Sequence, residues 1–323
     1  MPSHASELVH VWNRCHNCGA SPILGLRFSC QVCPAGADND LCEPCYHLFV
    51  QGRIEHPSLT AREAPSGRHV FLAFEGIARE RVLPWLSVPW STPAALGVPQ
   101  HGIVRPEFRS GRESFFGSYG FVVVAEDGGQ PLVLTALHVL DELAKFRGID
   151  CSDSNTSYSG RELPQQVTGV QLYDPFAANW MLAKIGAAGD MLPLPAARIC
   201  AIEPYSQRDI AAFRIIRSTP FTLRLAPSLP AVGDSIWLAV SPRHGARDRT
   251  IPAVVVEIAD ETFVFRFAGA VTMPVHCSGA PLLNRAAEVV AINIGGGMLD
   301  ECRLGHGCHV VSIRHHLGWK TKP

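Results

Sequence analysis

Three pairs of cysteines, each pair separated by two residues, lie close together near the start of this chain. They are Cys15/Cys18, Cys30/Cys33 and Cys42/Cys45, and the other five of the eleven cysteines are scattered over the remaining sequence. A secreted disulfide framework spreads its cysteines through the fold, whereas two thiolates in a CxxC turn can face one metal ion. The clustering therefore favours a zinc-binding module in a reducing compartment, and we expect a cytoplasmic protein.

Zinc takes four ligands in a tetrahedron, so six cysteines complete one site and half of a second. We expect two downstream histidines to supply the missing ligands, with His56 and His69 as first candidates and His47 or His101 as alternatives. A segment of about 70 residues with few long apolar runs lacks the core to fold alone, so bound metal would stabilise it.

The runs CHNC, GLRFSCQVC and NDLCEPC, together with the two histidines, resemble a ZZ-type zinc finger over roughly residues 10 to 70. The resemblance implies two structural zinc ions with interleaved ligands. One ion would bind Cys15, Cys18, Cys42 and Cys45, and the other Cys30, Cys33, His56 and His69. Members of this family often capture a protein N-terminus with acidic residues beside the DLC run, here Asp38 and Asp40. A purely structural or other docking role is the alternative, because His16 stands where amine-binding members often carry an aspartate.

The bulk composition excludes several classes of protein. Apolar residues make up 47% of the chain and the formal net charge is −1, so nothing indicates affinity for nucleic acid. The sequence contains no run of 18 apolar residues, so we expect no membrane-spanning helix. The first dozen residues lack the pattern of a signal peptide, so we expect no secretion. We expect three segments: a finger over 1–72, a linker over 73–101, and a larger domain over 102–323.

The linker contains VLPWLSVPWSTPAALGVPQ, residues 82–100, with four prolines and two tryptophans. Each proline removes an amide donor and fixes φ, so we expect an extended connector with neither helix nor central strand. We expect its tryptophans to pack against the neighbouring domain. The alternative is that this segment lies over an active site.

Short apolar runs punctuated by glycine and proline dominate the chain from about residue 112. YGFVVV and PLVLTA flank AEDGGQ, which predicts a β-hairpin, and the later runs DSIWLAV, AVVVEIA, TFVFRFA and EVVAINI predict further strands. VLDELAKF and VVSIRHHLGW are the two expected helices. This pattern predicts a mainly β domain, either a sandwich or a barrel.

Three motifs on these strands carry residues that could share one chemistry. LTALHVL places His138 at a strand end, QRDIAAFRI places Asp209 at a strand start, and CSGAPLL places Ser278 in a turn. The order His, Asp, Ser and the T-A-x-H-V, D-I-A and S-G-A-P-L motifs resemble the trypsin-like serine proteases over about 210 residues. The resemblance implies a chymotrypsin-like double β-barrel behind a small two-zinc ZZ-like domain, and a catalytic triad.

The nucleophile loop departs from that family at two positions. The resemblance implies an oxyanion hole formed by the amides of His276 and Ser278, but His276 stands where glycine is usual. A side chain there resists the required backbone conformation. Cys277 replaces an aspartate and could itself be a nucleophile, although the following Gly-Ala-Pro selects Ser278.

INIGGG, residues 292–297, matches the strand that binds the substrate backbone in this family. The match implies that Asn293 and Ile294 line the primary pocket, that Gly295 leaves its mouth open, and that Thr272 lies near its floor. No acidic residue falls at these positions, so we expect a preference for small or apolar side chains. CRLGHGCH at 302–309 is interpreted as a glycine-rich surface loop, with a third zinc site as the alternative.

The sequence thus predicts a serine endopeptidase whose zinc finger recruits a protein substrate or partner, with regulated cleavage in signalling or defence. Two alternatives stay open. One is a catalytically silent barrel that serves as a binding scaffold, and the other is a constitutive protease in which the finger only stabilises.

Overall fold

The computed structural model describes most of the chain. The described residues are 8–30, 40–56, 69–90, 93, 96, 102–110, 113–116, 118–124, 131–136, 139, 169–174, 179–185, 209–214, 222–240, 250–268 and 276–319. Within this part, no helix has the length and apolar character needed to cross a membrane. The predicted residues His138, Thr272, Asp38, Cys33 and His101 lie outside it, as does most of the expected helix VLDELAKF.

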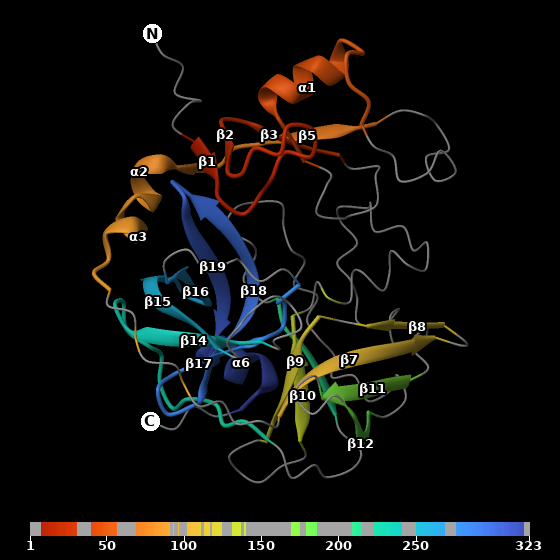
Figure 1. The fold of residues 1–323 in the computed structure, drawn as a ribbon, viewed down its shortest axis with the longest axis vertical. Coiled ribbons are helices and arrows are strands. Elements are labelled where there is room, and N and C mark those ends of the chain that lie inside the picture. Colours follow the sequence, from red (N-terminus) through yellow and green to blue (C-terminus); the bar gives the residue numbers. More distant parts are fainter. Residues whose placement is uncertain are drawn as a thin grey trace.

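Figure 1 shows an N-terminal module above two bodies of β structure. The module contains two small sheets, of order β2-β1-β6 and β4-β3-β5, and one helix. Its elements are β1 (Leu8–His10), β2 (Ile23–Leu24), β3 (Arg27–Cys30), β4 (Asp40–Cys42), α1 (Glu43–Val50), β5 (Phe71–Phe74) and β6 (Ile77–Ala78).

The first β body is a seven-stranded antiparallel sheet of order β12-β11-β7-β9-β10-β13, with β8 paired to β7. Its strands are β7 (Ile103–Ser110), β8 (Glu113–Phe116), β9 (Gly120–Val123), β10 (Leu132–Thr135), β11 (Gly169–Asp174), β12 (Asn179–Ile185) and β13 (Ala211–Arg214). The predicted hairpin is present, because β9 and β10 pair with Leu132 opposite Val123.

The second body is a closed six-stranded barrel of order β14-β15-β16-β19-β18-β17. Its elements are β14 (Ser235–Ala239), β15 (Thr250–Ile258), β16 (Thr262–Phe267), β17 (Pro281–Leu283), β18 (Val289–Leu299), β19 (Cys302–His309) and the helix α6 (Val310–Leu317). Alternation builds this barrel: Phe263 and Phe265 of β16 enter its core, whereas Val264 and Arg266 point outward.

The run CRLGHGCH is not a surface loop but β19, a strand hydrogen-bonded to both β16 and β18. Its glycines serve close packing. A Cβ atom on Gly305 would lie 2.1 Å from the Phe265 ring, and one on Gly307 would lie 2.9 Å from Leu282. The interpretation was wrong because glycine marks a close approach of core side chains as readily as it marks a turn.

The prolines predicted an extended linker without helices, and this prediction was wrong in part. Two short helices, α2 (Arg79–Val82) and α3 (Pro84–Ser87), lie along the side of the barrel (Figure 1). Pro84 occupies the first turn of α3, where its missing N–H is not needed and its fixed φ suits the helix. The expectation that the tryptophans pack on a neighbouring domain is confirmed for Trp85, which is 5% exposed in an apolar cluster with the barrel.

This cluster, called the shared cluster below, joins the N-terminal module and linker to the outside of the barrel. It consists of Val9, Val11, Trp12, Val82, Trp85, Val254, Val256, Val264, Leu299 and Leu304. Polar contacts surround it: Arg79 pairs with Asp300 at 2.5 Å, and Arg266 donates to the carbonyls of Trp85, Leu86 and Val88. The module is therefore packed against the barrel.

Candidate active site and zinc sites

The register of β10 and β13 brings two of the predicted triad segments to one end of the first sheet. Thr135 lies opposite Ala211 in this antiparallel pair. His138 follows Thr135 by three positions, and Asp209 precedes Ala211 by two. Ala136 and Ile210, the described neighbours of these strand ends, therefore lie at the same end of the pair, and His138 itself lies outside the described residues. Asp209 is 3% exposed.

The nucleophile loop of the barrel reaches the same place. The amide of Tyr119 donates to the carbonyl of Ser278 at 2.9 Å, and the Thr135 hydroxyl donates to the Tyr119 carbonyl at 2.5 Å. Gly279 has φ 82°, and a Cβ there would lie 2.0 Å from the Tyr119 oxygen. Only glycine fits this approach, so the glycine after Ser278 locks the loop against β10.

His276 adopts φ 58°, in the left-handed region that glycine prefers. For a residue with a Cβ this conformation costs about 1–2 kcal/mol. Position 276 therefore has the backbone conformation expected for a glycine, although it is occupied by a histidine. The structure retains the shape at the expense of local strain.

The three described residues that were expected to line the primary pocket, Asn293, Ile294 and Gly295, lie in three different environments. Asn293 is 6% exposed and its Nδ2 donates to the Cys277 carbonyl at 3.0 Å, while its main chain bonds to Gly279 and Ala280. It lies beneath the nucleophile loop and supports it. Ile294 is buried in the barrel core. A Cβ on Gly295 would meet no atom of the described residues within 4 Å, so open space lies beside it.

Burial sets the ionisation of two groups near this loop. Desolvation raises the pKa of the Cys277 thiol to about 12, so it is not a thiolate at neutral pH and is poorly suited to act as a nucleophile. Desolvation also lowers the pKa of His306 on β19 to about 4, with the Asp209 carboxylate acting in the opposite direction. His306 is therefore neutral at pH 7 and within electrostatic range of Asp209.

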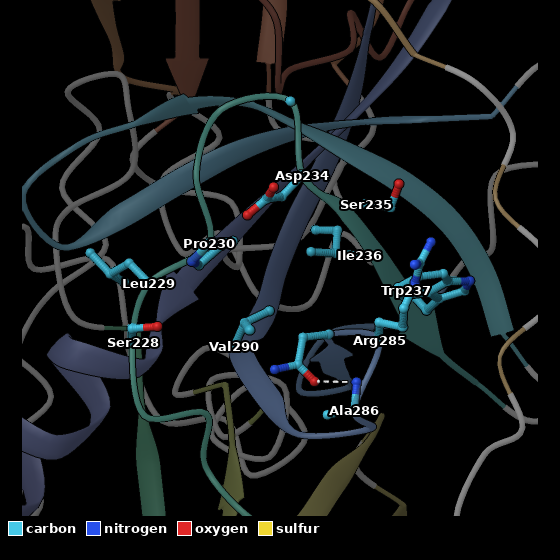
Figure 2. A pocket seen from close by; sticks show the side chains of 12 residues that line it. Ser228, Leu229, Pro230, Asp234, Ser235, Ile236, Trp237, Arg285, Ala286 and Val290 are labelled. Atoms are coloured by element: carbon cyan, nitrogen blue, oxygen red, sulfur yellow. Dashed lines mark hydrogen bonds between the residues drawn. The ribbon is translucent and has the colours of Figure 1, made fainter.

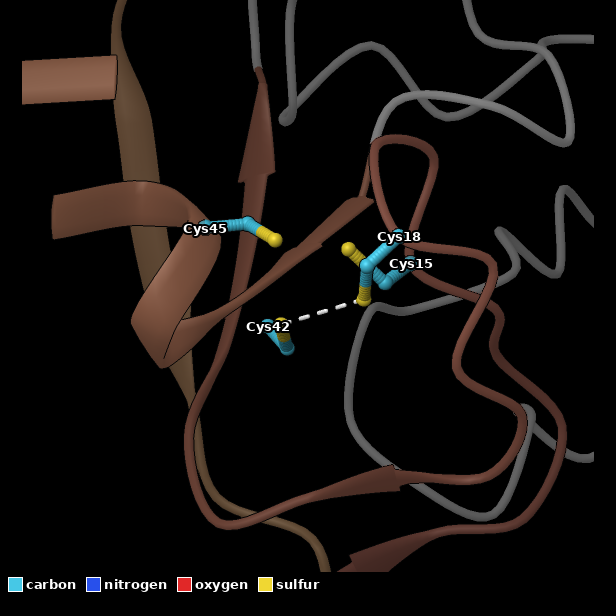
Figure 3. Close-up of side chains that lie close together, drawn as sticks. All are labelled: Cys15, Cys18, Cys42 and Cys45. Atoms are coloured by element: carbon cyan, nitrogen blue, oxygen red, sulfur yellow. Dashed lines mark hydrogen bonds between the residues drawn. The ribbon is translucent and has the colours of Figure 1, made fainter. Parts of the chain in front are cut away.

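Four cysteine sulfurs converge in the N-terminal module. The Sγ atoms of Cys15, Cys18, Cys42 and Cys45 all lie within 4.8 Å of one another (Figure 3). Cys18 and Cys42 are 3.8 Å apart, which equals the edge of a tetrahedron with Zn–S bonds of about 2.3 Å. The donor set and its spacing fit a structural zinc ion, and Asn17 donates to the Cys45 sulfur at 3.3 Å.

A second group joins Cys30, His56 and His69, whose ligand atoms also lie within 4.8 Å of one another. The Cys30 sulfur lies 3.5 Å from Nδ1 of His69, close to the sulfur–nitrogen edge expected around zinc. The alternative His47 lies elsewhere, with its Nε2 3.9 Å from Glu43 on the exposed side of α1. The structure thus brings together three of the four ligands predicted for the second site.

Two family models match the chain. The trypsin-like peptidase domain matches residues 118–292, more than half of the chain, and the ZZ-type zinc finger matches residues 10–53. This chain belongs to the trypsin-like peptidase family. Its N-terminal module is a ZZ-type zinc finger, and the fold is the predicted mainly β architecture with a barrel.

Solved structures similar to this peptidase include the Rv3671c protease of M. tuberculosis. Its active form is 16% identical, with a TM-score of 0.42, covering 73% of this chain and 95% of that chain. An inactive form is 15% identical, with a TM-score of 0.43, covering 72% and 98%. No curated protein sequence matches this chain.

The predicted amine-binding carboxylate of the finger already has protein partners. Asp40 is 9% exposed and accepts from Arg27 Nη1 at 3.0 and 3.1 Å and from Asn13 Nδ2 at 2.8 Å. Arg27 in turn lies over the Phe74 ring. A free amine at Asp40 would therefore compete with a buried guanidinium.

A cavity of about 540 Å³ lies on the peptidase barrel between the loop before β14 and the turn after β17 (Figure 2). None of the predicted catalytic or zinc residues lines it. Two of its polar groups serve the turns themselves: Asp234 accepts from the Ala231 amide, and Asn284 accepts from the amides of Ala286 and Glu288. The candidate active site lies elsewhere.

Sequence reasoning missed the residues that hold the site together. Tyr119 and Thr135 fix the nucleophile loop, and Trp12 of the finger stacks on His306 of the barrel. Asn293 was predicted for the pocket, but its bond to the Cys277 carbonyl was not. Thr135 carried a signal, because it opens the T-A-L-H motif. Tyr119 and Trp12 carried none, since their partners are distant in sequence.

Proposed function

We propose that this protein is a serine endopeptidase that cleaves proteins through His138, Asp209 and Ser278. The single observation that carries the proposal is the convergence of three segments. The pair β10/β13 aligns the positions beside His138 and Asp209, and Tyr119 and Thr135 tie the Ser278 loop to β10.

In this reaction the Ser278 hydroxyl attacks the peptide carbonyl while His138 accepts its proton. His138 then gives that proton to the leaving amine. Asp209 holds the imidazole tautomer and stabilises the imidazolium. The amides of Ser278 and His276 face the developing oxyanion. Water repeats the sequence and releases the acid from Ser278.

The finger would bind two structural zinc ions through the two ligand groups described above, with Cys33 completing the second. We further propose that it docks a protein partner or substrate and that the enzyme acts in regulated cleavage. Capture of a protein N-terminus would involve Asp38 and Asp40, and at Asp40 it would have to compete with Arg27.

A silent scaffold is the second candidate, and the strained His276 is the observation that favours it. Labelling of the full chain with a fluorophosphonate probe separates the two. The endopeptidase predicts labelling of the native chain and of Cys277→Ala, and none of Ser278→Ala. A native chain that stays unlabelled under every condition, with or without zinc and with candidate partner proteins present, would favour the scaffold instead.

A further inference from the structure

Gly295, Gly297 and His306 share one face of the strand pair β18/β19. Gly295 and His306 are register partners, so their side-chain positions lie on the same face, and Gly297 follows two residues later. The opposite face is the barrel interior, because Cβ atoms on Gly305 and Gly307 would meet core side chains there. The shared face therefore points outward.

The zinc finger covers this outward face. A Cβ on Gly297 would lie 1.9 Å from the carbonyl oxygen of Val11. The Trp12 indole stacks on the His306 ring, with centroids 5.2 Å apart and planes 11° apart. Figure 1 shows β1 lying at the ends of β18 and β19. The cover stops short of Gly295, where a Cβ would meet no described atom within 4 Å.

We propose that the finger forms one wall of the substrate pocket, with Trp12, stacked on His306, closing the space beside Gly295. The proposal rests on the proposed endopeptidase function. It makes Trp12 a specificity-determining residue from outside the peptidase domain. A pocket closed by two stacked rings accepts small, uncharged side chains at the residue before the scissile bond and excludes aromatic ones.

Several contacts fix this wall in position. Trp85 lies against Trp12, with centroids 6.3 Å apart. Asn13 is bonded to Asp40, and Cys15, three residues after Trp12, belongs to the first zinc group. Because these neighbours hold the indole, the pocket has a rigid wall where a mobile loop would leave it adaptable. The ring pair is also uncharged, since burial keeps His306 neutral at pH 7.

The test uses the full chain and peptidyl phosphonate probes that react with an active serine and carry Ala, Val, Leu or Phe at the residue before the phosphorus. The native protein should react faster with the Ala and Val probes. Trp12→Leu should raise the Phe-to-Ala rate ratio by at least about tenfold, because the pocket deepens. Trp12→Phe, which preserves most of the docking contact, should give a smaller shift in the same direction.

Trp85→Leu is the matched control: it removes an indole from the same cluster and one of several supports of Trp12, but it leaves the Trp12 ring in the wall, so its rate ratio should shift much less than that of Trp12→Leu. An unchanged ratio in both Trp12 variants, or a native preference for the Phe probe, would overturn the inference while leaving the endopeptidase intact. A native chain that reacts with neither these probes nor a simple fluorophosphonate would remove the proposed function and the pocket together.

Discussion

His276 is the residue where the candidate site departs furthest from what the backbone prefers, with φ 58°. We expect His276→Gly to stabilise the protein by about 1 kcal/mol, a rise in Tm of about 2–4 °C. If the strain also misaligns the oxyanion donor, the same change should raise the rate of fluorophosphonate labelling by up to about 10²-fold.

Ala287 provides a control for His276, since it has φ 59° in the turn between β17 and β18. Ala287→Gly should give a similar gain in Tm with no change in labelling rate. Equal labelling rates for native protein and both variants would mean that His276 does not limit the oxyanion hole.

His306 makes stability depend on pH in a defined direction. Its folded pKa of about 4 lies below the ordinary value of about 6.5, so the unfolded chain binds more protons between these values. Stability from this group is complete above pH 6.5 and is lost as the pH falls toward 4. Between pH 7.5 and 5.5 the loss is about 1 kcal/mol.

Urea unfolding of native protein and His306→Phe at both pH values measures this effect. Phenylalanine keeps an aromatic ring beside Trp12 but cannot titrate. The variant should therefore lose about 1 kcal/mol less on acidification than the native protein. An equal loss of unfolding free energy in the native protein and in His306→Phe would show that groups other than His306 cause the pH dependence.

At the scale of the element, two glycines of the strand β18, Gly295 and Gly297, have different surroundings. A Cβ on Gly297 would collide with the Val11 backbone, whereas one on Gly295 meets nothing among the described atoms. Gly297→Ala should therefore push the finger off the barrel and destabilise the protein by about 1–3 kcal/mol. Gly295→Ala should change stability little.

Hydrogen exchange checks this difference locally. Gly297→Ala should increase exchange across β1 and in α2, the elements that meet the barrel in the shared cluster. Slow exchange there in both alanine variants would show that the finger tolerates the extra methyl group, contrary to the close approach of Val11.

Local patterns predicted the hairpin of the first sheet and a large part of the barrel. Alternating apolar runs predicted β9, β10, β14, β15, β16 and β18, and the CxxC spacing predicted a zinc module. The pattern failed at β19, because Gly305 and Gly307 are required by Phe265 and Leu282, partners that no local window contains. It failed at α3 because a proline that excludes a helix interior is compatible with a helix start.

The site was predictable only where a motif carried it. The motifs around Asp209 and Ser278 lie on segments that converge, while His138 stays a prediction. Spacing alone could not choose among His47, His56, His69 and His101, because the choice depends on how the chain folds back on β3. The stacking of Trp12 on His306 joins residues almost three hundred positions apart, beyond the reach of any periodicity.

At the scale of the whole molecule, Arg266 ties the linker to the barrel. Its Nη1 donates to the carbonyls of Trp85, at 3.0 Å, and Leu86, and its Nη2 donates to Val88 at 2.5 Å. Arg266→Met removes these charged hydrogen bonds, and we expect a loss of about 2–3 kcal/mol in unfolding free energy. Arg266→Lys should lose less, since an ammonium can bond some of the carbonyls.

Chemical denaturation gives the two values, and hydrogen exchange over residues 83–90 shows whether the linker has loosened. Faster exchange there with an unchanged first β sheet is the expected pattern. An Arg266→Met variant as stable as the native chain would mean that water replaces the guanidinium at no cost.

The shared cluster also bears on how such a chain could arise or be rebuilt. Val254, Val264 and Leu304 point outward from the peptidase barrel and are buried in the shared cluster, which the finger and the linker helices complete. A gene rearrangement that transferred this peptidase domain alone would expose these apolar side chains to solvent as an aggregation-prone patch. Descendants that lost the finger should therefore carry lysine, glutamate or threonine at these three positions, and an engineer who wishes to exchange the finger must rewrite the barrel's outer wall as well.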